Sequence, residues 1–209
     1  MTKKERVTKI IIELNKLFPR AQIMLNYSSP WELLVAVILS AQCTDKMVNR
    51  VTEKLFKKYQ ILEDYINADV SEFEKDNFAT GFYRMKAKHI LASAHIIKNK
   101  YNGEVPKSMV EILKLPGVGR KTANVVLGNA YGVIEGIAVD THVIRLSHIL
   151  RLSKHTDPKN IEKDLMKVVP HKEWLKFTYL LIEYGRKYCS ARKHDHKNCP
   201  MTRILSKVS

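Results

Sequence analysis

The chain has 209 residues, of which 45% are hydrophobic and 27% are charged, so it is long enough to bury a sizeable core. Lys and Arg number 36 against 21 Asp and Glu, which gives a formal net charge of +15. This excess favours a polyanionic partner, most often nucleic acid, with a lysine-rich solubilising surface as the alternative. No apolar run reaches the roughly 18 residues of a membrane span, so we expect no membrane partner.

Three cysteines, an odd number, argue against a disulfide framework and favour a reducing compartment. The first residues lead into an amphipathic pattern and not into the apolar core of a signal peptide. We therefore expect an intracellular protein, in the cytoplasm or nucleoid. Because no apolar stripe suggests a subunit interface, we also expect a monomer.

Helical periodicity dominates the chain, and no segment alternates with the period of a strand, which predicts an all-α fold. The first helix has one apolar face between Val7 and Leu17 and ends at Phe18-Pro19. Ser29-Pro30 predicts the start of a second helix. Because this helix is apolar on all sides over Leu33–Leu39, we expect it to be central and buried.

The rest of the chain also has the sequence signals of helices. Thr44 should cap a third helix, and four glycines (81, 103, 132 and 185) fall where helices should end, a place that favours left-handed backbone. Further helices are predicted over Val70–Asn77, Tyr83–Lys100, Ser108–Lys114, Lys121–Ala130, Thr141–Leu150, Asn160–Val168 and Lys172–Tyr184.

A helical hairpin is predicted at Leu115-Pro116-Gly117-Val118-Gly119-Arg120-Lys121-Thr122-Ala123. Its two glycines allow the backbone to approach a ligand without obstruction by a Cβ atom. The helix that follows offers unsatisfied N–H groups and the positive end of its dipole. The pattern favours a seat for a phosphate group, with a turn kept only for helix packing as the alternative.

Lys121 and Asp140 are the candidate reactive residues. Lys121 lies where the second helix of the hairpin begins, and the dipole there disfavours a protonated amine. Because a neutral amine is a nucleophile, the position suits covalent catalysis as well as a phosphate contact. Asp140 follows a buried-looking stretch, Ile137–Val139. It can cap the helix that begins near Thr141, serve as a fixed carboxylate in a reaction, or do both.

The hairpin and the segment Val139-Asp140-Thr141-His142 together resemble the helix-hairpin-helix DNA glycosylases, in particular the endonuclease III family. Two further segments, Ser40–Asp45 and Gly81–Ala87, are similar to that family. The resemblance implies a two-lobed all-α fold with the active site in a cleft between the lobes. Residues 23–134 would form the central lobe, with the hairpin motif at about 108–130, and residues 1–22 and 135–209 would form the other.

The resemblance implies a base-excision-repair enzyme, a DNA glycosylase with AP lyase activity, that acts on oxidised pyrimidines and abasic sites in double-stranded DNA. Cleavage 3′ to the abasic site by β-elimination would follow a lysine imine intermediate. Lys121 falls on the family's nucleophile and Asp140 on its catalytic aspartate. The alternatives are a non-catalytic DNA-binding module and a glycosylase of the same fold with another base preference.

The resemblance also implies DNA contacts. Gln42 matches the residue that fills the gap left by a flipped nucleotide, and Phe82 falls where an apolar wedge enters the base stack. Otherwise Gln42 ends a helix and Phe82 belongs to the core. The remaining expected contacts lie in the hairpin and in the helix after Asp140: Leu115, Gly117, Val118, Gly119, Arg120, Thr122, His142 and Arg145.

Members of this family normally end in four cysteines, spaced Cys-x6-Cys-x2-Cys-x5-Cys, that hold a 4Fe–4S cluster. Counted from Cys189, the other three positions are His196, Cys199 and Leu205. Because leucine has no lone pair and an imidazole replaces one thiolate, we expect no cluster, no other metal and no required cofactor. A residual cluster is one alternative, and zinc bound by Cys189, His194, His196 and Cys199 is the other.

Overall fold

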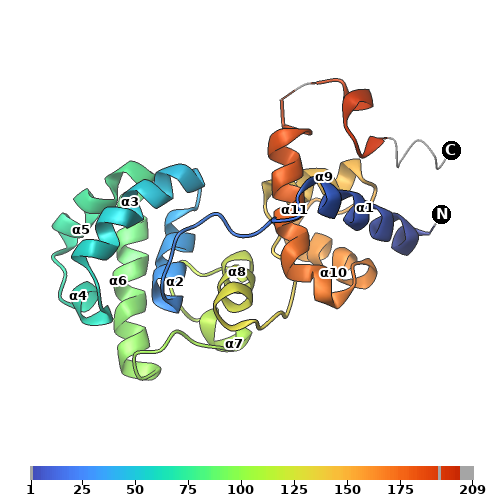
Figure 1. Ribbon diagram of the computed structural model, residues 1–209. Helices are drawn as coiled ribbons and strands as arrows, with labels where there is room; N and C mark the ends of the chain where they lie inside the picture. Colours follow the sequence, from blue (N-terminus) through green and yellow to red (C-terminus); the bar gives the residue numbers. More distant parts are fainter. Residues whose placement is uncertain (1, 193, 203–209) are drawn as a thin grey trace. The chain divides into compact units, whose positions relative to one another are not determined.

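The computed structural model describes residues 2–192 and 194–202. Within these residues every regular element is a helix and no strand is present, which confirms the all-α prediction. The chain divides into two compact units (Figure 1). One unit comprises Met24–Glu135, and the other joins the residues up to Ile23 with those from Gly136 onward.

The 24–135 unit is built around α2 (Pro30–Leu39), whose residues from Leu33 to Leu39 are all buried, as predicted. The longer helices of the unit pack against α2; they are α3 (Asp45–Lys58), α6 (Tyr83–Lys100) and α8 (Arg120–Tyr131). The shorter elements are α4 (Leu62–Ile66) and α5 (Val70–Asn77), which lie against α6, the 3₁₀ turn η1 (Phe78–Thr80), and α7 (Met109–Ile112), which lies against α8.

Polar caps fix the start of most helices in this unit. Ser29, Thr44, Asp69 and Ser108 each accept a hydrogen bond from the backbone N–H three residues later. Such a side chain satisfies an N–H group for which the helix has no partner. Two of the longer helices, α6 and α8, begin without any side-chain cap. Both begin within the segments that the resemblance assigns to DNA.

The other unit contains α1 (Lys3–Leu17), α9 (Thr141–Ile149), α10 (Pro158–Val168) and α11 (Trp174–Lys187), with 3₁₀ turns η2 (His171–Glu173) and η3 (His196–Asn198). A capping box between Thr2 and Glu5 starts α1. Helices α9, α10 and α11 all take part in one core with α1. Its largest contributors include Ile10, Leu14, Leu146, Leu165, Phe177, Leu180 and Tyr184.

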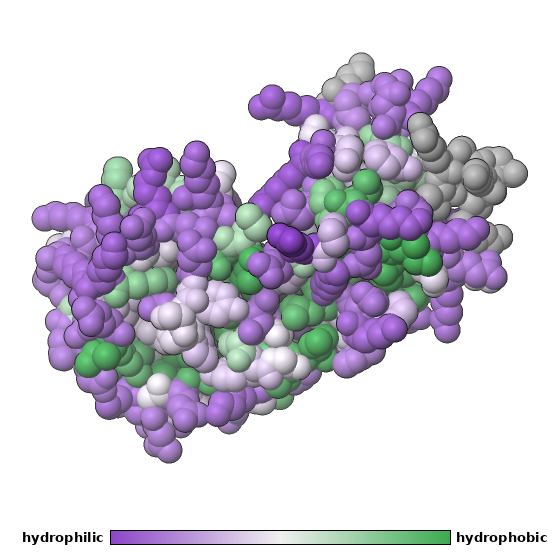
Figure 2. Space-filling view, in the orientation of Figure 1, coloured by the Kyte–Doolittle hydropathy of each residue, from purple (hydrophilic) through white to green (hydrophobic). Residues whose placement is uncertain are grey.

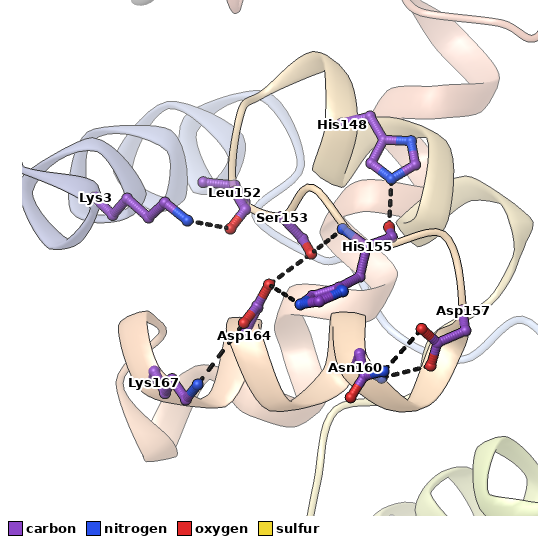
Figure 3. A network of polar contacts seen from close by, with 9 residues as sticks. All are labelled: Lys3, His148, Leu152, Ser153, His155, Asp157, Asn160, Asp164 and Lys167. Atoms are coloured by element: carbon purple, nitrogen blue, oxygen red, sulfur yellow. Dashed lines mark hydrogen bonds and ion pairs between the residues drawn. The ribbon is translucent and has the colours of Figure 1, made fainter.

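Polar contacts hold the connection between α9 and α10 (Figure 3). Ser153 Oγ donates to Asp164 Oδ2 at 2.7 Å and accepts from the His155 N–H at 3.1 Å. Asp157 caps α10 by accepting from the Asn160 N–H at 2.9 Å. This hydrogen bond holds the pKa of the Asp157 carboxyl below its usual value. Ser153 and Asp157 therefore anchor the segment between α9 and α10 to α10.

The structure departs from the sequence prediction in three places. The periodicity gives no sign of α4, because five residues are too few to display a helical repeat. α10 begins at Pro158, before the predicted start at Asn160, since Asp157 caps it and proline suits the first turn. Gly185 lies inside α11 and not at a helix end. The glycines at 81, 103 and 132 do have positive φ angles, as predicted.

Hydrophilic side chains cover most of the face seen in Figure 2, with small apolar patches between them. No helix among the residues that the structure describes is long and apolar enough to cross a membrane.

Candidate active site

The predicted hairpin is formed by α7, a tight turn and α8. Leu115 and Val118 are buried, and the Val118 N–H donates to the Leu115 carbonyl at 3.2 Å. Gly117 between them has a φ of +76°, a conformation that disfavours any residue with a side chain. A Cβ on Gly117 would lie 2.7 Å from Nδ1 and 3.0 Å from Cβ of His89 in α6. The turn therefore needs glycine both for its backbone and for its packing.

The start of α8 is open. Its N-cap residue, Gly119, contributes no side-chain hydrogen bond, and a Cβ placed there would meet nothing within 4 Å. Arg120 and Lys121 are exposed in the first helical turn, whereas Thr122 is half-buried. The side chains of Leu115 and Val118 are buried and anchor the turn, so only the backbone of these residues is available to a ligand. The geometry offers N–H groups, a helix dipole and an exposed amine at one place on the 24–135 unit.

Asp140 begins α9 in the other unit. Its carboxylate accepts a hydrogen bond from the Val143 N–H at 2.8 Å, so the capping role predicted from sequence is present. The preceding residues, Ile137 to Val139, are buried and so anchor the backbone that leads into Asp140. Asp140 itself is half-buried and keeps a second carboxylate oxygen beyond the one that caps the helix.

The other two predicted residues of α9 lie against α11. A Cβ on Gly185 would come within 2.5 Å of His142 Nδ1 and 3.0 Å of Arg145 Nη2. This close approach explains a glycine inside α11, where its helix propensity is poor. Arg145 is half-buried, and its Nη1 lies 3.6 Å from Cys189 Sγ. Its guanidinium thus has a contact inside its own unit, and its role toward DNA stays a prediction.

Gln42 and Phe82 share an unusual backbone conformation. Both are exposed and left-handed, with φ angles of 52° and 48°, although neither is glycine. Phe82 is 67% exposed, so it does not belong to the core. Gln42 lies beyond Ser40, the C-cap of α2, and so does not end that helix. Strained, exposed positions of this kind occur at sites where function holds them in place.

A buried lysine, Lys86, links the turn that carries Gln42 to the turn that carries Phe82. Lys86 is only 4% exposed, and its Nζ donates to the Leu39 carbonyl at 2.8 Å and to the Thr80 carbonyl at 2.7 Å. The first carbonyl precedes the turn of Gln42, and the second precedes that of Phe82. Burial lowers the pKa of Lys86. This residue fixes both turns relative to each other within the 24–135 unit.

Sequence reasoning did not single out Lys86. A signal was available, because Lys86 falls in phase with the buried positions Ala87, Ile90 and Ala94 of α6. A charged residue on the apolar face of a helix must find partners inside the protein. The identity of those partners, two carbonyls from separate segments, is visible only in the fold.

The expectation that the C-terminal region offers no metal site is wrong. Cys189, His194, His196 and Cys199 each place one ligand atom within 4.8 Å of all the others. Both cysteines are buried, at 1% and 4% exposure. The fourth family position, Leu205, lies outside the described residues. The four-cysteine register does not include His194, whereas the fold brings together the set that the sequence offered only as the alternative.

Comparisons with known proteins extend these observations. Residues 35–171 match the family model described as HhH-GPD superfamily base excision DNA repair protein. The chain is 48% identical over 203 residues to endonuclease III of Synechocystis sp., covering 97% of this chain and 93% of that one. A solved structure of a trapped endonuclease III–DNA covalent intermediate is 42% identical with a TM-score of 0.92, covering 100% of both chains. A non-covalent endonuclease III–DNA complex is 44% identical with a TM-score of 0.92, covering 98% and 95%.

Proposed function

This chain belongs to the HhH-GPD superfamily of base excision DNA repair proteins and, within it, to the endonuclease III family, and on that premise we propose how its residues act. The family resemblance is confirmed. The protein is a base-excision-repair enzyme, a DNA glycosylase and AP lyase, and its partner is DNA. A purely non-catalytic binding module is thereby set aside. As substrates we propose duplexes that carry oxidised pyrimidines or abasic sites.

The hairpin would hold the DNA backbone. An anion next to Gly119 would meet the first N–H groups of α8 with no Cβ in its way. A phosphate bound there contributes affinity and register without reading base sequence. Arg120 adds a positive charge beside the same helix end. The net charge of +15 would strengthen this binding at low salt through counterion release.

Gln42 and Phe82 would open the duplex. The base to be removed must leave the stack, because its C1′ atom cannot be reached inside the helix. The exposed ring of Phe82 would enter the stack as a wedge, and Gln42 would fill the space left behind. Both residues extend from turns that the buried ammonium of Lys86 holds. Rigid support matters, since unstacking costs a few kcal/mol for each base step.

Lys121 would be the nucleophile. Its exposed position in the first turn of α8 puts the amine beside the proposed phosphate seat. The neutral Nζ attacks C1′, the bond from C1′ to the base breaks, and the base leaves with the electron pair and takes up a proton. Loss of one amine proton, and breaking of the bond from C1′ to O4′ as that oxygen takes up a proton, give a protonated imine that keeps the other N–H. The similarity to a trapped covalent endonuclease III–DNA intermediate supports this step.

The lyase step would follow from the imine. The positively charged C=N bond acidifies the C2′ proton, whose removal expels the 3′ phosphate as the bond from C3′ to oxygen breaks. The strand is cut on the 3′ side of the lesion, and water then releases the lysine from the aldehyde. No oxidant or reductant enters any of these steps.

Asp140 would stabilise the charge that develops on the sugar as the base leaves. A carboxylate fixed by the Val143 N–H at 2.8 Å needs no reorganisation when that charge appears. Its second oxygen can also take the proton that the amine loses. Asp140 thus would have two roles at once, as the cap of α9 and as a catalytic carboxylate.

The observation that carries this proposal is an exposed lysine at an open, glycine-capped helix start. Borohydride reduction of the reacting complex should trap a covalent adduct on a duplex that contains thymine glycol. Lys121→Gln should abolish the adduct, whereas Lys114→Gln, which removes another exposed lysine of the same hairpin, should retain it. An adduct that persists in Lys121→Gln would exclude Lys121 as the nucleophile. Repeating the assay with other damaged bases tests the proposed preference for oxidised pyrimidines.

A further inference from the structure

Two cysteines and two histidines after α11 bring their ligand atoms within 4.8 Å of one another. His194 Nε2 lies 3.3 Å from Cys199 Sγ, and His196 Nδ1 lies 3.7 Å from Cys189 Sγ and 4.0 Å from Cys199 Sγ. We propose that Cys189, His194, His196 and Cys199 bind a single Zn²⁺ ion with tetrahedral geometry. The two buried sulfurs form the inner side of this site, and the two imidazoles form its outer side.

The spacing of the ligand atoms fits one small ion. With Zn–S bonds of about 2.3 Å and Zn–N bonds of about 2.05 Å, nitrogen and sulfur ligands at a tetrahedral angle stand about 3.5 Å apart. The three distances between nitrogen and sulfur, 3.3, 3.7 and 4.0 Å, lie on either side of this value. In a 4Fe–4S cluster the ligands bind four different irons at the outer corners of a cube, so they must stand farther apart than the ligands of one ion.

His194 already has the tautomer that a metal ligand needs. Its Nδ1 lies 2.8 Å from the carbonyl oxygen of Arg192, which can only accept a hydrogen bond. Nδ1 therefore carries the proton, and Nε2 directs its lone pair toward Cys199. A hydrogen bond from the other ring nitrogen to a carbonyl is the usual support of a zinc-bound histidine.

His196 presents its Nδ1 to both sulfur atoms, and its ring lies 4.3 Å from that of His194 between centroids. The surrounding backbone holds this orientation. Asp195 accepts a hydrogen bond from the Lys197 N–H at 2.9 Å, and the Cys199 N–H donates to the His196 carbonyl at 3.0 Å. His196 thus lies in the 3₁₀ turn η3, and Cys199 follows it directly as the C-cap.

The charges of the site balance with a divalent ion. Binding would form two Zn–S and two Zn–N bonds and release the two thiol protons to solvent, which leaves a neutral centre. Arg145 Nη1 lies 3.6 Å from Cys189 Sγ and would stabilise that thiolate. Cys199 Sγ now donates to the Tyr188 carbonyl at 3.5 Å, and it would give up this weak contact for the bond to zinc.

Bound zinc would crosslink α11 to the segment that follows it. Cys189 lies just beyond the C-cap of α11, while His194, His196 and Cys199 lie on the following segment. The same segment is docked by Met201, which is buried and whose N–H donates to the hydroxyl of Tyr184 at 3.2 Å. Because α11 packs against α9, the ion would stabilise the unit that carries Asp140.

The test is the metal content of the purified, untagged full chain. Elemental analysis should find one zinc per chain, without acid-labile sulfide. After zinc is removed with a chelator, Co²⁺ should restore the site and give the intense visible bands of a tetrahedral ion together with a sulfur-to-cobalt charge-transfer band. Removal of zinc should lower the Tm by several degrees, and its return should reverse the loss.

Variants of the two proposed histidine ligands test where the ion binds. His194→Ala and His196→Ala should each lose zinc and the tetrahedral cobalt spectrum, and both should remain folded by circular dichroism because the two rings lie at or near the surface. His95→Ala removes an exposed histidine from the other unit, and Cys43→Ala removes the third cysteine; both should keep the ion.

Three results would overturn the proposal. The first is iron with stoichiometric sulfide in the purified protein. The second is zinc that remains bound in both His194→Ala and His196→Ala. The third is a metal-free protein that takes up no Co²⁺. None of these results depends on DNA cleavage, so the zinc site is tested separately from the proposed reaction.

Discussion

The N-terminal ends of α8 and α9 differ in whether a side chain accepts a hydrogen bond from their first backbone N–H groups. Each helix begins with N–H groups that have no partner inside the helix. At α9 the chain supplies its own anion, because the Asp140 carboxylate accepts from the Val143 N–H. At α8 the N-cap residue supplies no acceptor, since Gly119 has no side chain, and its Cβ position faces open space. One helix end is capped by a side chain of the protein, and the other has no side-chain cap, as the phosphate site that we propose there requires.

This difference fits the different roles that we propose for the two helix ends. A helix start that binds DNA phosphate must not carry its own acceptor, because an internal carboxylate would compete for the N–H groups and repel the ligand. A carboxylate used in catalysis benefits from such a fixed position, because its charge is already oriented before the reaction. Exchanging the properties of the two caps is therefore the most direct way to test the comparison.

The largest effect is expected for Asp140→Asn. Asparagine caps a helix as well as aspartate does, so α9 should keep its stability while the charge is lost. Turnover on thymine-glycol duplex should fall by about 10²–10³-fold, the usual effect of removing one electrostatic contact to a transition state. Single-turnover kinetics measures it, with thermal unfolding as the control.

Asp140→Ala separates the two roles of this residue. It removes the charge and the cap together, so it should lose the same activity and also about 1 kcal/mol of stability. If Asp140→Asn turned over normally while Asp140→Ala did not, the carboxylate would be only a cap.

Gly117→Ala should damage the fold of the hairpin. Alanine would be held at a φ of +76° with its Cβ 3.0 Å or less from three atoms of His89. We expect a loss of about 1–3 kcal/mol in the free energy of unfolding, measured by urea denaturation. The double variant Gly117→Ala with His89→Ala should recover part of this loss, because it removes the collision but not the backbone strain.

Gly119→Asp should close the open end of α8. The φ of −93° suits any residue, and the site has room for a side chain. The new carboxylate should raise stability by about 0.3–1 kcal/mol and weaken binding to undamaged duplex by about tenfold. Gly119→Ser, which caps without charge, should lose much less affinity. Equal affinity for the aspartate variant and the wild type would show that no phosphate binds at this helix end.

The smallest effect concerns the far end of α8. The Tyr131 hydroxyl donates to the Val105 carbonyl at 2.8 Å, and burial raises the pKa of Tyr131 to about 12. An unfolded tyrosine titrates near pH 10, so this contribution to stability is complete below about pH 10 and is lost as the pH rises toward 12. Tyr131→Phe should cost about 1 kcal/mol at neutral pH and reduce the loss of stability between pH 10 and 12. An unchanged alkaline profile would contradict this account.

The all-α class, most helix positions and the family could be predicted from the sequence alone, because they depend on local signals. The apolar run Leu33–Leu39 predicts a buried helix wherever it lies, and Gly117 marks a turn through its own backbone freedom. The same holds for Asp140, whose capping bond reaches only to Val143.

Which separate segments of the chain come into contact is visible only in the folded protein. Lys86 binds carbonyls 47 and 6 residues away, and no pattern in one segment names both partners. His194 lies beside the two cysteines because the chain after α11 folds back; the sequence named this set as an alternative, but its spacing alone did not favour a metal over none. Gly185 looks like a helix end in sequence, yet it is required by the approach of His142. Local propensity acts over a few residues, while a site is made by contacts that depend on the path of the whole chain.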